Sequence, residues 1–218
     1  MRKFKYKILD TIRNLEWRYA VKKFNDDKVL PEEKVDLLKK AFNLTATSYG
    51  LQPITLLVIK NKALQQLLVQ HSFEQQQVAQ ASHVLVICTQ KIIDSQYIHR
   101  YFDKIRKVRG TSDEILNPFK SALVKDFSKK DVEEIKKWAI NQAYLAMGNL
   151  LTICAMEKID SCPMEGFEPS AYDEVLKLDK KGLASVLVLP IGYRAEDDMF
   201  SDFKKVRKDI ADSVIDIL

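Results

Sequence analysis

One long apolar stretch constrains the fold more than any other feature of the chain. The pattern of residues 131–157 predicts a single helix, and its centre, residues 139–155, is apolar nearly all round. Ser128 and Asp131 stand just before it and can cap its N-terminus. A helix without a polar face must be covered on every side, so it lies either in the core of one chain or at an interface between subunits.

The remaining pattern predicts a helix-rich α+β domain with a short central sheet. Three continuous apolar runs of strand length indicate strands covered on both faces, at residues 54–60, 84–89 and 184–192. Helical spacing is predicted for residues 4–17, 31–42, 62–69, 97–108 and 119–127, and residues 18–30 are predicted to form a polar connection. No repeat or linker divides the 218 residues, so we expect one domain over residues 1–218.

Charge and cysteine content argue against several classes of protein. The 35 basic and 30 acidic residues are interspersed, without the clustered basic stripe of a nucleic-acid-binding protein. Cys88, Cys154 and Cys162 stand in apolar surroundings without C-x-x-C spacing, which favours buried reduced thiols and a cytoplasmic location. No apolar run has the length of a membrane span or follows the basic N-terminus as in a signal peptide, so we expect no membrane association.

The common catalytic signatures are absent from the sequence. Its six glycines form neither G-x-G-x-x-G nor a phosphate-binding P-loop, and there is no G-x-S-x-G. His71, His83 and His99 lack metal-ligand spacing, so we predict no metal site, and we expect His83 to make a structural hydrogen bond at the start of a strand. If the protein is an enzyme, an organic cofactor is expected to carry its chemistry.

A short loop follows the long helical pattern and precedes a new one. Pro163, Met164, Glu165 and Gly166 combine a rigid residue, an acidic residue and a glycine. Considered alone, this loop is more simply a tight turn between two elements. Its alternative role is to present backbone N–H groups to a flat heteroaromatic ligand, which a glycine permits to approach closely.

Four separate segments together carry a specific resemblance. They are residues 16–24 (EWRYAVKKF), 45–53 (TATSYGLQP), 162–168 (CPMEGFE) and 203–207 (FKKVR). In this order and at these separations they closely resemble the flavin-dependent nitroreductase family, specifically its oxygen-insensitive NAD(P)H nitroreductase and dihydropteridine reductase branch. Residues 81–84, 144–149 and 189–193 extend the resemblance over essentially the whole chain.

The resemblance implies a fold and an assembly. The family fold is a central mixed β-sheet surrounded by helices, with the long apolar helix buried in the interface of an intertwined homodimer. The alternative is a monomer in which this helix is the central core helix. Residues 97–127 are expected to form a mobile helical cover over the active site, and most of their aromatic side chains are expected to serve ordinary packing, namely Tyr101, Phe102, Phe119 and Phe127.

The resemblance also implies bound FMN, with NAD(P)H as electron donor. By similarity, Arg18 and Arg207 would bind the phosphate, Lys205 would lie beside them, and the backbone of Tyr19 and Ala20 would shape the cradle. A phosphate monoester carries about −1.5 to −2 charges at neutral pH, so it needs several converging cations. Taken singly, each of these cations is more simply a solvated surface residue.

The same resemblance assigns the two edges of the flavin ring. Lys22 would stabilise negative charge at the N1 and O2 edge of the reduced ring, with Lys23 as the competing residue if the register shifts by one. The backbone N–H groups of Glu165 and Gly166 would face N5 and O4. Glu165 is therefore expected to act in positioning, and not as a catalytic acid.

Pro163 and Met164 would cover one face of the ring. Donor and acceptor must then use the other face in turn, which is ping-pong hydride transfer through N5. The expected activity is reduction of flat electron acceptors such as nitroaromatics, quinones or dihydropteridines, by either NADH or NADPH. The alternatives are another flavin reaction on the same fold, such as flavin fragmentation or reductive dehalogenation, and a non-catalytic basic binding module.

The chain departs from the family pattern at four positions. Gly50 stands where many members have Asn, and Ile54 stands where they have an aromatic residue, although Gln52 and Pro53 between them match. At the pyrimidine edge, Glu74 and Gln77 occupy positions where Asn and Lys are common. These differences bear more on the substrate than on the cofactor.

Overall fold

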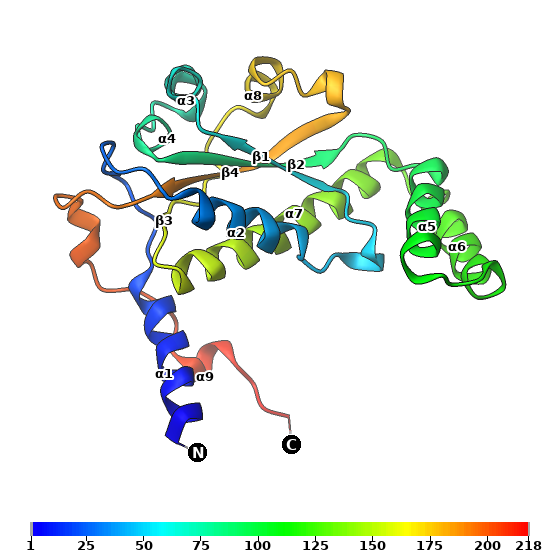
Figure 1. Ribbon diagram of the computed structural model, residues 1–218, viewed down its shortest axis with the longest axis horizontal. Coiled ribbons are helices and arrows are strands. Elements are labelled where there is room, and N and C mark those ends of the chain that lie inside the picture. The colour runs from blue at the N-terminus through cyan, green and yellow to red at the C-terminus, as the bar shows by residue number, and fades with distance from the viewer. Residues whose placement is uncertain (1, 218) are drawn as a thin grey trace.

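The computed structural model describes residues 2–217, with side chains from Asp10 onward. A sheet with helices on both faces forms the body (Figure 1). One helical pair lies to one side of the sheet, and the first helix and the C-terminal residues extend away from the body. The helices are α1 (Arg2–Trp17), α2 (Glu32–Asn43), α3 (Lys62–Val69), α4 (Gln77–Gln80), α5 (Ser95–Arg109), α6 (Asp113–Phe127), α7 (Val132–Met156), α8 (Pro169–Val175) and α9 (Ile210–Ser213), and short 3₁₀ turns are η1 (Ser48–Gly50), η2 (Gln70–Ser72), η3 (Asp179–Lys181) and η4 (Met199–Asp202).

The sheet contains β1 (Ile54–Ile59), β2 (His83–Gln90), β3 (Asp160–Ser161) and β4 (Leu183–Gly192) in the order β1-β2-β4-β3. All three pairings between these strands are antiparallel. A parallel contact is made by an isolated bridge between Ala20 and Ser161, at the end of β3. The α+β class is thus confirmed, and the parallel part of the expected mixed sheet is confined to that bridge.

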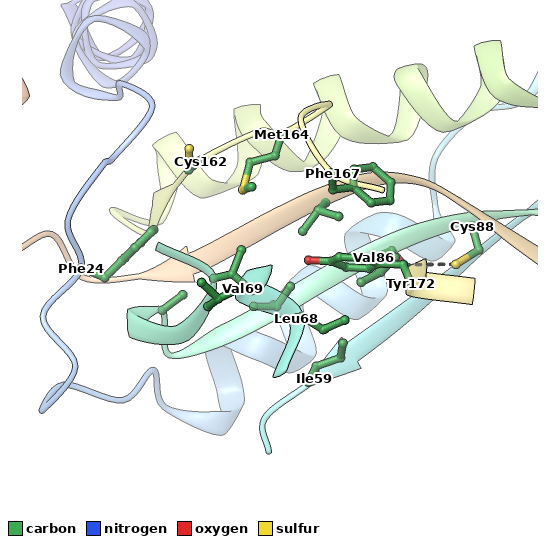
Figure 2. Packing of buried hydrophobic residues seen from close by; sticks show 14 of the residues in the cluster. Phe24, Ile59, Leu68, Val69, Val86, Cys88, Cys162, Met164, Phe167 and Tyr172 are labelled. Atoms are coloured by element: carbon green, nitrogen blue, oxygen red, sulfur yellow. Dashed lines mark hydrogen bonds between the residues drawn. The ribbon is translucent and has the colours of Figure 1, made fainter. Parts of the chain in front are cut away.

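Alternation along the strands divides the core into two clusters. Val84, Val86 and Cys88 of β2 face the layer that contains α3, α4 and α8 (Figure 2). Leu85 and Ile87 face α2 and α7. Successive residues of a strand point to opposite faces, so one central strand supplies both clusters. The expectation of full burial is confirmed for β2, whereas β1 is only half-buried because it is the edge strand.

The long helix α7 begins where the sequence indicated. Asp131 is its N-cap and forms a capping box with Glu134: the Asp131 carboxylate accepts from the Glu134 N–H at 2.8 Å, and the Glu134 carboxylate accepts from the Asp131 N–H at 2.9 Å. One side of α7 packs against α2 and the sheet. The opposite side leaves Tyr144 and Leu145 exposed by 45% and 54%. The helix is therefore not covered all round by its own chain.

The remaining periodic predictions are confirmed or corrected as follows. The helix predicted for residues 119–127 starts earlier, at Asp113. Helices α5 and α6 pack against each other around Phe102 and Phe127, which are buried as expected, whereas Phe119 is half-exposed. Residues 18–30 connect α1 to α2 as predicted, but the prediction that this connection is polar is wrong, because Val21, Phe24 and Leu30 inside it are buried. The segment is an anchored part of the body.

The two ends of the chain expose apolar side chains. Ile12 of α1 is 51% exposed, and Ile210 and Ile215 near the C-terminus are exposed as well. Ile8, within the predicted helix of residues 4–17, lies outside the described side chains. Across residues 2–217 no helix combines the length and the apolar character needed to cross a membrane.

Candidate functional site

The Pro163 loop is an extension of the sheet. Met164 forms an antiparallel bridge with Val188 of β4: its N–H donates to the Val188 carbonyl at 2.8 Å, and the Val188 N–H donates back at 3.1 Å. The Cys162 N–H donates to the Pro190 carbonyl at 3.0 Å. Cys162 and Met164 are consequently buried side chains of the core, while Glu165 is exposed. The tight-turn interpretation therefore accounts for only part of the loop.

Two neighbouring backbone donors of this loop are unpaired. Within residues 2–217, the N–H groups of Glu165 and Gly166 donate to no acceptor, although the next N–H, of Phe167, donates to the Glu165 carbonyl at 3.0 Å. Beside them lies a pocket of about 440 Å³ lined by Tyr144, Met147, Pro163, Met164, Glu165 and Leu187. Unpaired backbone donors at a pocket are suited to an acceptor atom of a ligand.

Three polar side chains converge on Cys162 and Gly166. The Lys22 ammonium lies 4.0 Å from the Cys162 sulfur, and the Gln77 amide nitrogen lies 3.9 Å from it. Gln75 donates to the Gly166 carbonyl at 2.8 Å. Burial raises the pKa of the Cys162 thiol, and the positive charge of Lys22 opposes that shift. The loop thus has a cation and two amides directly beside it.

The structure distinguishes Lys22 from Lys23 and Gln77 from Glu74 as candidate site residues. Lys22 is the lysine beside the loop, because Lys23 forms an exposed ion pair with Asp197. Gln77 is 4% exposed next to Cys162, whereas Glu74 is exposed and its carboxylate makes no hydrogen bond or ion pair with the described residues. Gln75, between these two positions, was not predicted to take part.

A group of cations lies where the two ends of the chain meet the body. The Lys205 ammonium donates to the backbone carbonyl of Arg18, although 186 residues separate them along the chain. Burial lowers the pKa of Lys205, and the positive charges of Arg18, Arg207 and Arg194 lower it further. The three predicted phosphate-binding cations are therefore brought together. The Glu16 carboxylate acts on Lys205 in the opposite direction. Cations within electrostatic range of one another favour an anion among them.

Arg194 was missed by sequence reasoning. Its guanidinium forms an ion pair with the buried Asp160 of β3, with Nε and Nη2 at 2.7 and 2.6 Å from Oδ1. The ring centroids of Trp17 and Tyr19 lie 4.4 and 4.5 Å from the guanidinium carbon, at cation–π distance. The only signal available beforehand was its place directly after the last apolar strand.

Asp198 is a second residue that sequence reasoning missed. Its Oδ2 accepts from the backbone N–H of Lys22 at 2.9 Å, from that of Lys23 at 3.2 Å and from the Tyr19 hydroxyl at 3.0 Å. Burial raises the pKa of Asp198, but these bonds and one from the Phe200 N–H outweigh it and lower the pKa below its ordinary value. Asp198 thus fastens the segment that carries Lys22 to the segment after β4.

Predicted residues Tyr19 and Ala20 lie between the cation group and the loop. Ala20 forms the parallel bridge to Ser161, and the Val21 N–H donates to the Ser161 carbonyl at 3.2 Å. Ser161 is followed directly by Cys162 and the Pro163 loop. Residues 18–21 and residues 161–166 therefore form one continuous strip, which runs from the cations to the unpaired N–H groups.

The Gly50 departure has a local physical reason. Gly50 has a φ of 71°, and a Cβ at this position would lie 2.2 Å from the Tyr101 hydroxyl oxygen. Any other residue there would be strained by the positive φ and would displace the Tyr101 side chain of α5. The backbone conformation and this contact thus explain the glycine at position 50.

The fold and the site together define a class of protein: an α+β domain with a group of cations at one end of a strip and unpaired backbone donors at the other. The sequence profile of the nitroreductase family matches residues 15–193. The chain belongs to the nitroreductase family.

Individual relatives agree with this assignment. A protein of Staphylococcus haemolyticus, provisionally named an NAD(P)H nitroreductase, is 30% identical over 197 residues, which are 86% of this chain and 90% of that protein. One of the same provisional name from Staphylococcus aureus strain N315 is 28% identical over 206 residues, 91% of this chain and 92% of the relative.

Solved structures share the fold. A nitroreductase-like protein of Streptococcus mutans superposes with a TM-score of 0.82 at 22% identity, over 97% of this chain and all (100%) of that one. A provisionally named nitroreductase of Exiguobacterium sibiricum, solved in complex with FMN, superposes with a TM-score of 0.78 at 19% identity, over 94% and 96% of the two chains.

Proposed function

We propose that this chain is an FMN-dependent oxidoreductase that takes electrons from NADH or NADPH and reduces flat acceptors such as nitroaromatics and quinones, with dihydropteridines as a further substrate class. The observation that carries the proposal is the pairing, in one strip, of the Arg18, Lys205 and Arg207 cations with the unpaired N–H groups of Glu165 and Gly166. The FMN bound to the Exiguobacterium protein of the same fold supports it.

The donor set fits the two chemical ends of FMN. A phosphate that carries nearly two negative charges matches three cations that have no carboxylate among their hydrogen-bond partners in the described structure. An isoalloxazine edge presents nitrogen and carbonyl acceptors, which match two adjacent N–H groups. Between the ends, Tyr19 and Ala20 would shape the cradle.

Lys22 would stabilise the reduced cofactor. Its ammonium lies beside Cys162 at the foot of the loop, and Asp198 holds its backbone in place. A fixed cation at the edge where negative charge develops favours the reduced state. Gln77, buried beside Cys162, would contribute an amide at the same edge, and the exposed Glu74 would contribute less.

When bound, FMN supplies the hydride chemistry, accepting from the nicotinamide and donating to the acceptor. Pro163 is half-buried at the pocket, whereas the Met164 side chain packs into the core. Pro163 would therefore present the protein surface that covers one face of the ring, with Met164 contributing mainly through its backbone. Donor and acceptor would bind in turn at the other face, in a ping-pong scheme that needs no protein base.

We include a homodimer in the proposal, with the site at the interface. Tyr144 and Leu145 on the outer side of α7 and Ile12 and Leu15 on α1 are exposed apolar or aromatic side chains. A groove of about 780 Å³ between α6, α7 and the start of β4 is open as well. Exposed apolar surface of this extent is typical of a surface that a second subunit covers. A cytoplasmic location is proposed because Cys88, Cys154 and Cys162 are free and buried.

The test is a titration of purified protein with FMN, followed by steady-state oxidation of NADH and of NADPH. We expect a yellow protein whose oxidation of one nucleotide is stimulated by menadione or a nitrofuran. FMN-loaded protein that oxidises neither nucleotide would overturn the reductase and point to another flavin reaction on this fold. A protein that is colourless once unbound FMN has been removed, and is retained on DNA at moderate salt, would instead be a binding module.

A further inference from the structure

The loop with the two unpaired N–H groups is held by side chains from two directions. From α7, the Tyr144 hydroxyl donates to Glu165 Oε1 at 2.7 Å. From the segment between η2 and α4, Gln75 donates to the Gly166 carbonyl at 2.8 Å. Each side chain therefore holds one of the two residues whose N–H groups are unpaired.

The backbone holds the peptide planes of the two donors through their carbonyl sides. The Glu165 N–H shares a plane with the Met164 carbonyl, which accepts from the Val188 N–H at 3.1 Å. The Gly166 N–H shares a plane with the Glu165 carbonyl, which accepts from the Phe167 N–H at 3.0 Å. This second bond closes a three-residue turn around Gly166, a residue with wide freedom in φ and ψ, so the direction of the donors there depends on what else holds Glu165 and Gly166.

Gln75 is itself held in place. Phe73 and Glu74 before it have φ values of 51° and 59°, a left-handed conformation that is uncommon outside glycine. The Gln75 amide nitrogen also donates to the Ser72 carbonyl at 3.0 Å, and the Gln77 amide donates to Gln75 Oε1 at 3.0 Å. With its oxygen engaged by Gln77, the Gln75 amide can turn only its N–H groups toward Gly166.

Glycine at position 166 allows this contact. A Cβ on Gly166 would lie 3.2 Å from the Gln75 amide nitrogen and 3.6 Å from the Phe73 ring. A side chain would thus press on the amide that holds the loop. The hydrogen bond to Glu165 raises the pKa of the Tyr144 phenol, which therefore stays a protonated donor at neutral pH.

We propose that Tyr144 and Gln75 are positioning residues that keep the turn around Gly166 closed and so aim the unpaired N–H groups of the loop at the isoalloxazine edge, an inference that rests on the proposed function. Tyr144 acts through the Glu165 carboxylate, and Gln75 acts through the Gly166 carbonyl. The role of the Glu165 carboxylate is to accept from Tyr144.

The first experiment uses protein without FMN, so it does not depend on activity. Amide hydrogen exchange of Phe167, whose N–H closes the turn, is measured by NMR in the wild type, in Tyr144→Phe and in Gln75→Met. We expect this exchange to accelerate about fivefold in each variant, the factor for one lost hydrogen bond. Tyr193→Phe is the matched control, because its hydroxyl has no hydrogen-bond partner among the described residues, and it should exchange like the wild type. Unchanged exchange in both test variants would overturn the proposal.

The second experiment uses FMN-loaded protein. We expect Tyr144→Phe to lower kcat about fivefold with a smaller change in the KM for the nicotinamide nucleotide, and to shift the absorption band of bound FMN. FMN retention should stay near that of the wild type, since the cation group is intact. Equal kcat and an unshifted spectrum would overturn the positioning role.

A double-mutant cycle tests the route through Glu165. Glu165→Gln keeps a carbonyl acceptor for Tyr144 and should behave nearly as the wild type, whereas Glu165→Ala should match Tyr144→Phe. The combined Tyr144→Phe/Glu165→Ala variant should be no worse than either single variant. Additive losses would contradict the route through Glu165. If the wild type binds no FMN but its exchange responds as described, the proposed function fails while the loop-holding role stands.

Discussion

The two ends of the site are built by different physics. At one end, Arg18, Lys205 and Arg207 come from chain segments outside the sheet, and the last two stand on exposed coil. At the other end, the Glu165–Gly166 loop continues from the sheet and is bonded to β4, Tyr144 and Gln75. Attraction between charges tolerates small displacements, whereas hydrogen bonds weaken steeply with angle. The directional end therefore needs the rigid support, and the charged end does not.

The largest expected effect comes from breaking the Arg194–Asp160 ion pair, which lies between the two ends of the site. Arg194→Ala leaves Asp160 of β3 buried without its partner, which should lower the free energy of unfolding by about 3–5 kcal/mol. Urea unfolding measures the loss. The control is Arg13→Ala, because the Arg13–Asp10 pair is exposed and its removal should change little. Equal stability of the two variants would show that the Arg194 pair does not join the ends.

Removing one phosphate-end cation should affect FMN binding and leave the loop untouched. We expect Arg207→Ala to weaken FMN binding about 10- to 150-fold, the range for a charged hydrogen bond of roughly 1.5–3 kcal/mol, so that FMN is lost on dialysis. Lys208→Ala, a change of the neighbouring cation, is the control and should retain FMN. Wild-type retention by Arg207→Ala would remove Arg207 from the site.

Asp198 connects the segment that carries Lys22 to the body, so we expect its removal to have an effect of intermediate size on stability. Asp198→Ala leaves the Lys22 and Lys23 N–H groups without an acceptor and should cost about 1–3 kcal/mol of stability at pH 7. Thermal unfolding with and without FMN measures it. Full stability in this variant would show that water replaces the carboxylate.

The dependence of stability on pH should reveal the contribution of Asp198 as well. The pKa of Asp198 is lower in the folded protein than its ordinary value of 3.8, so the unfolded chain binds a proton first as the pH falls. The stability it contributes is present above about pH 3.8 and is lost as the pH drops through the folded value. We expect the stability difference between pH 7 and pH 3 to be smaller in Asp198→Asn than in the wild type. An equal difference would assign the acid sensitivity to other carboxylates.

The smallest expected effect concerns the three buried thiols, of which Cys162 begins the loop at the rigid end. Burial raises the pKa of Cys88 and of Cys154 to about 12, and it also raises the pKa of Cys162. Because the folded values lie above the unfolded ones, the thiols favour folding below about pH 9, and that contribution declines as the pH rises toward 12. Ellman's reagent at pH 8 should label none of them before unfolding and all after. Rapid labelling of Cys162 in the folded protein would show that the loop end opens.

Much of the secondary structure could be predicted because it is set by local pattern. The runs that form β1, β2 and β4 are continuous and apolar, and the Asp131 cap marks the start of α7. The error over residues 18–30 arose because Val21, Phe24 and Leu30 are separated by charged residues and show no period. Their burial depends on contacts with the distant Ser161 and Tyr193.

Within the site, the residues that carry a family pattern could be predicted and the residues that hold them could not. Arg18, Lys205, Arg207 and the Pro163 loop stand in recognisable segments. Asp198, Arg194 and Gln75 belong to none, because each acts on a segment more than 30 residues away in the chain, and their partners are known only once the chain is folded.

By itself, the sequence determined β1, β2 and β4, the longer helices including the apolar α7, and the types of donor available to a ligand, since these follow from spacing and side-chain chemistry. Only the tertiary structure decided that Lys22 and not Lys23 lies beside the loop, that Gln77 is buried and Glu74 is not, and that two adjacent N–H groups remain unpaired. The physical reason is that burial and hydrogen-bond pairing depend on which distant segments meet, and no local pattern records that.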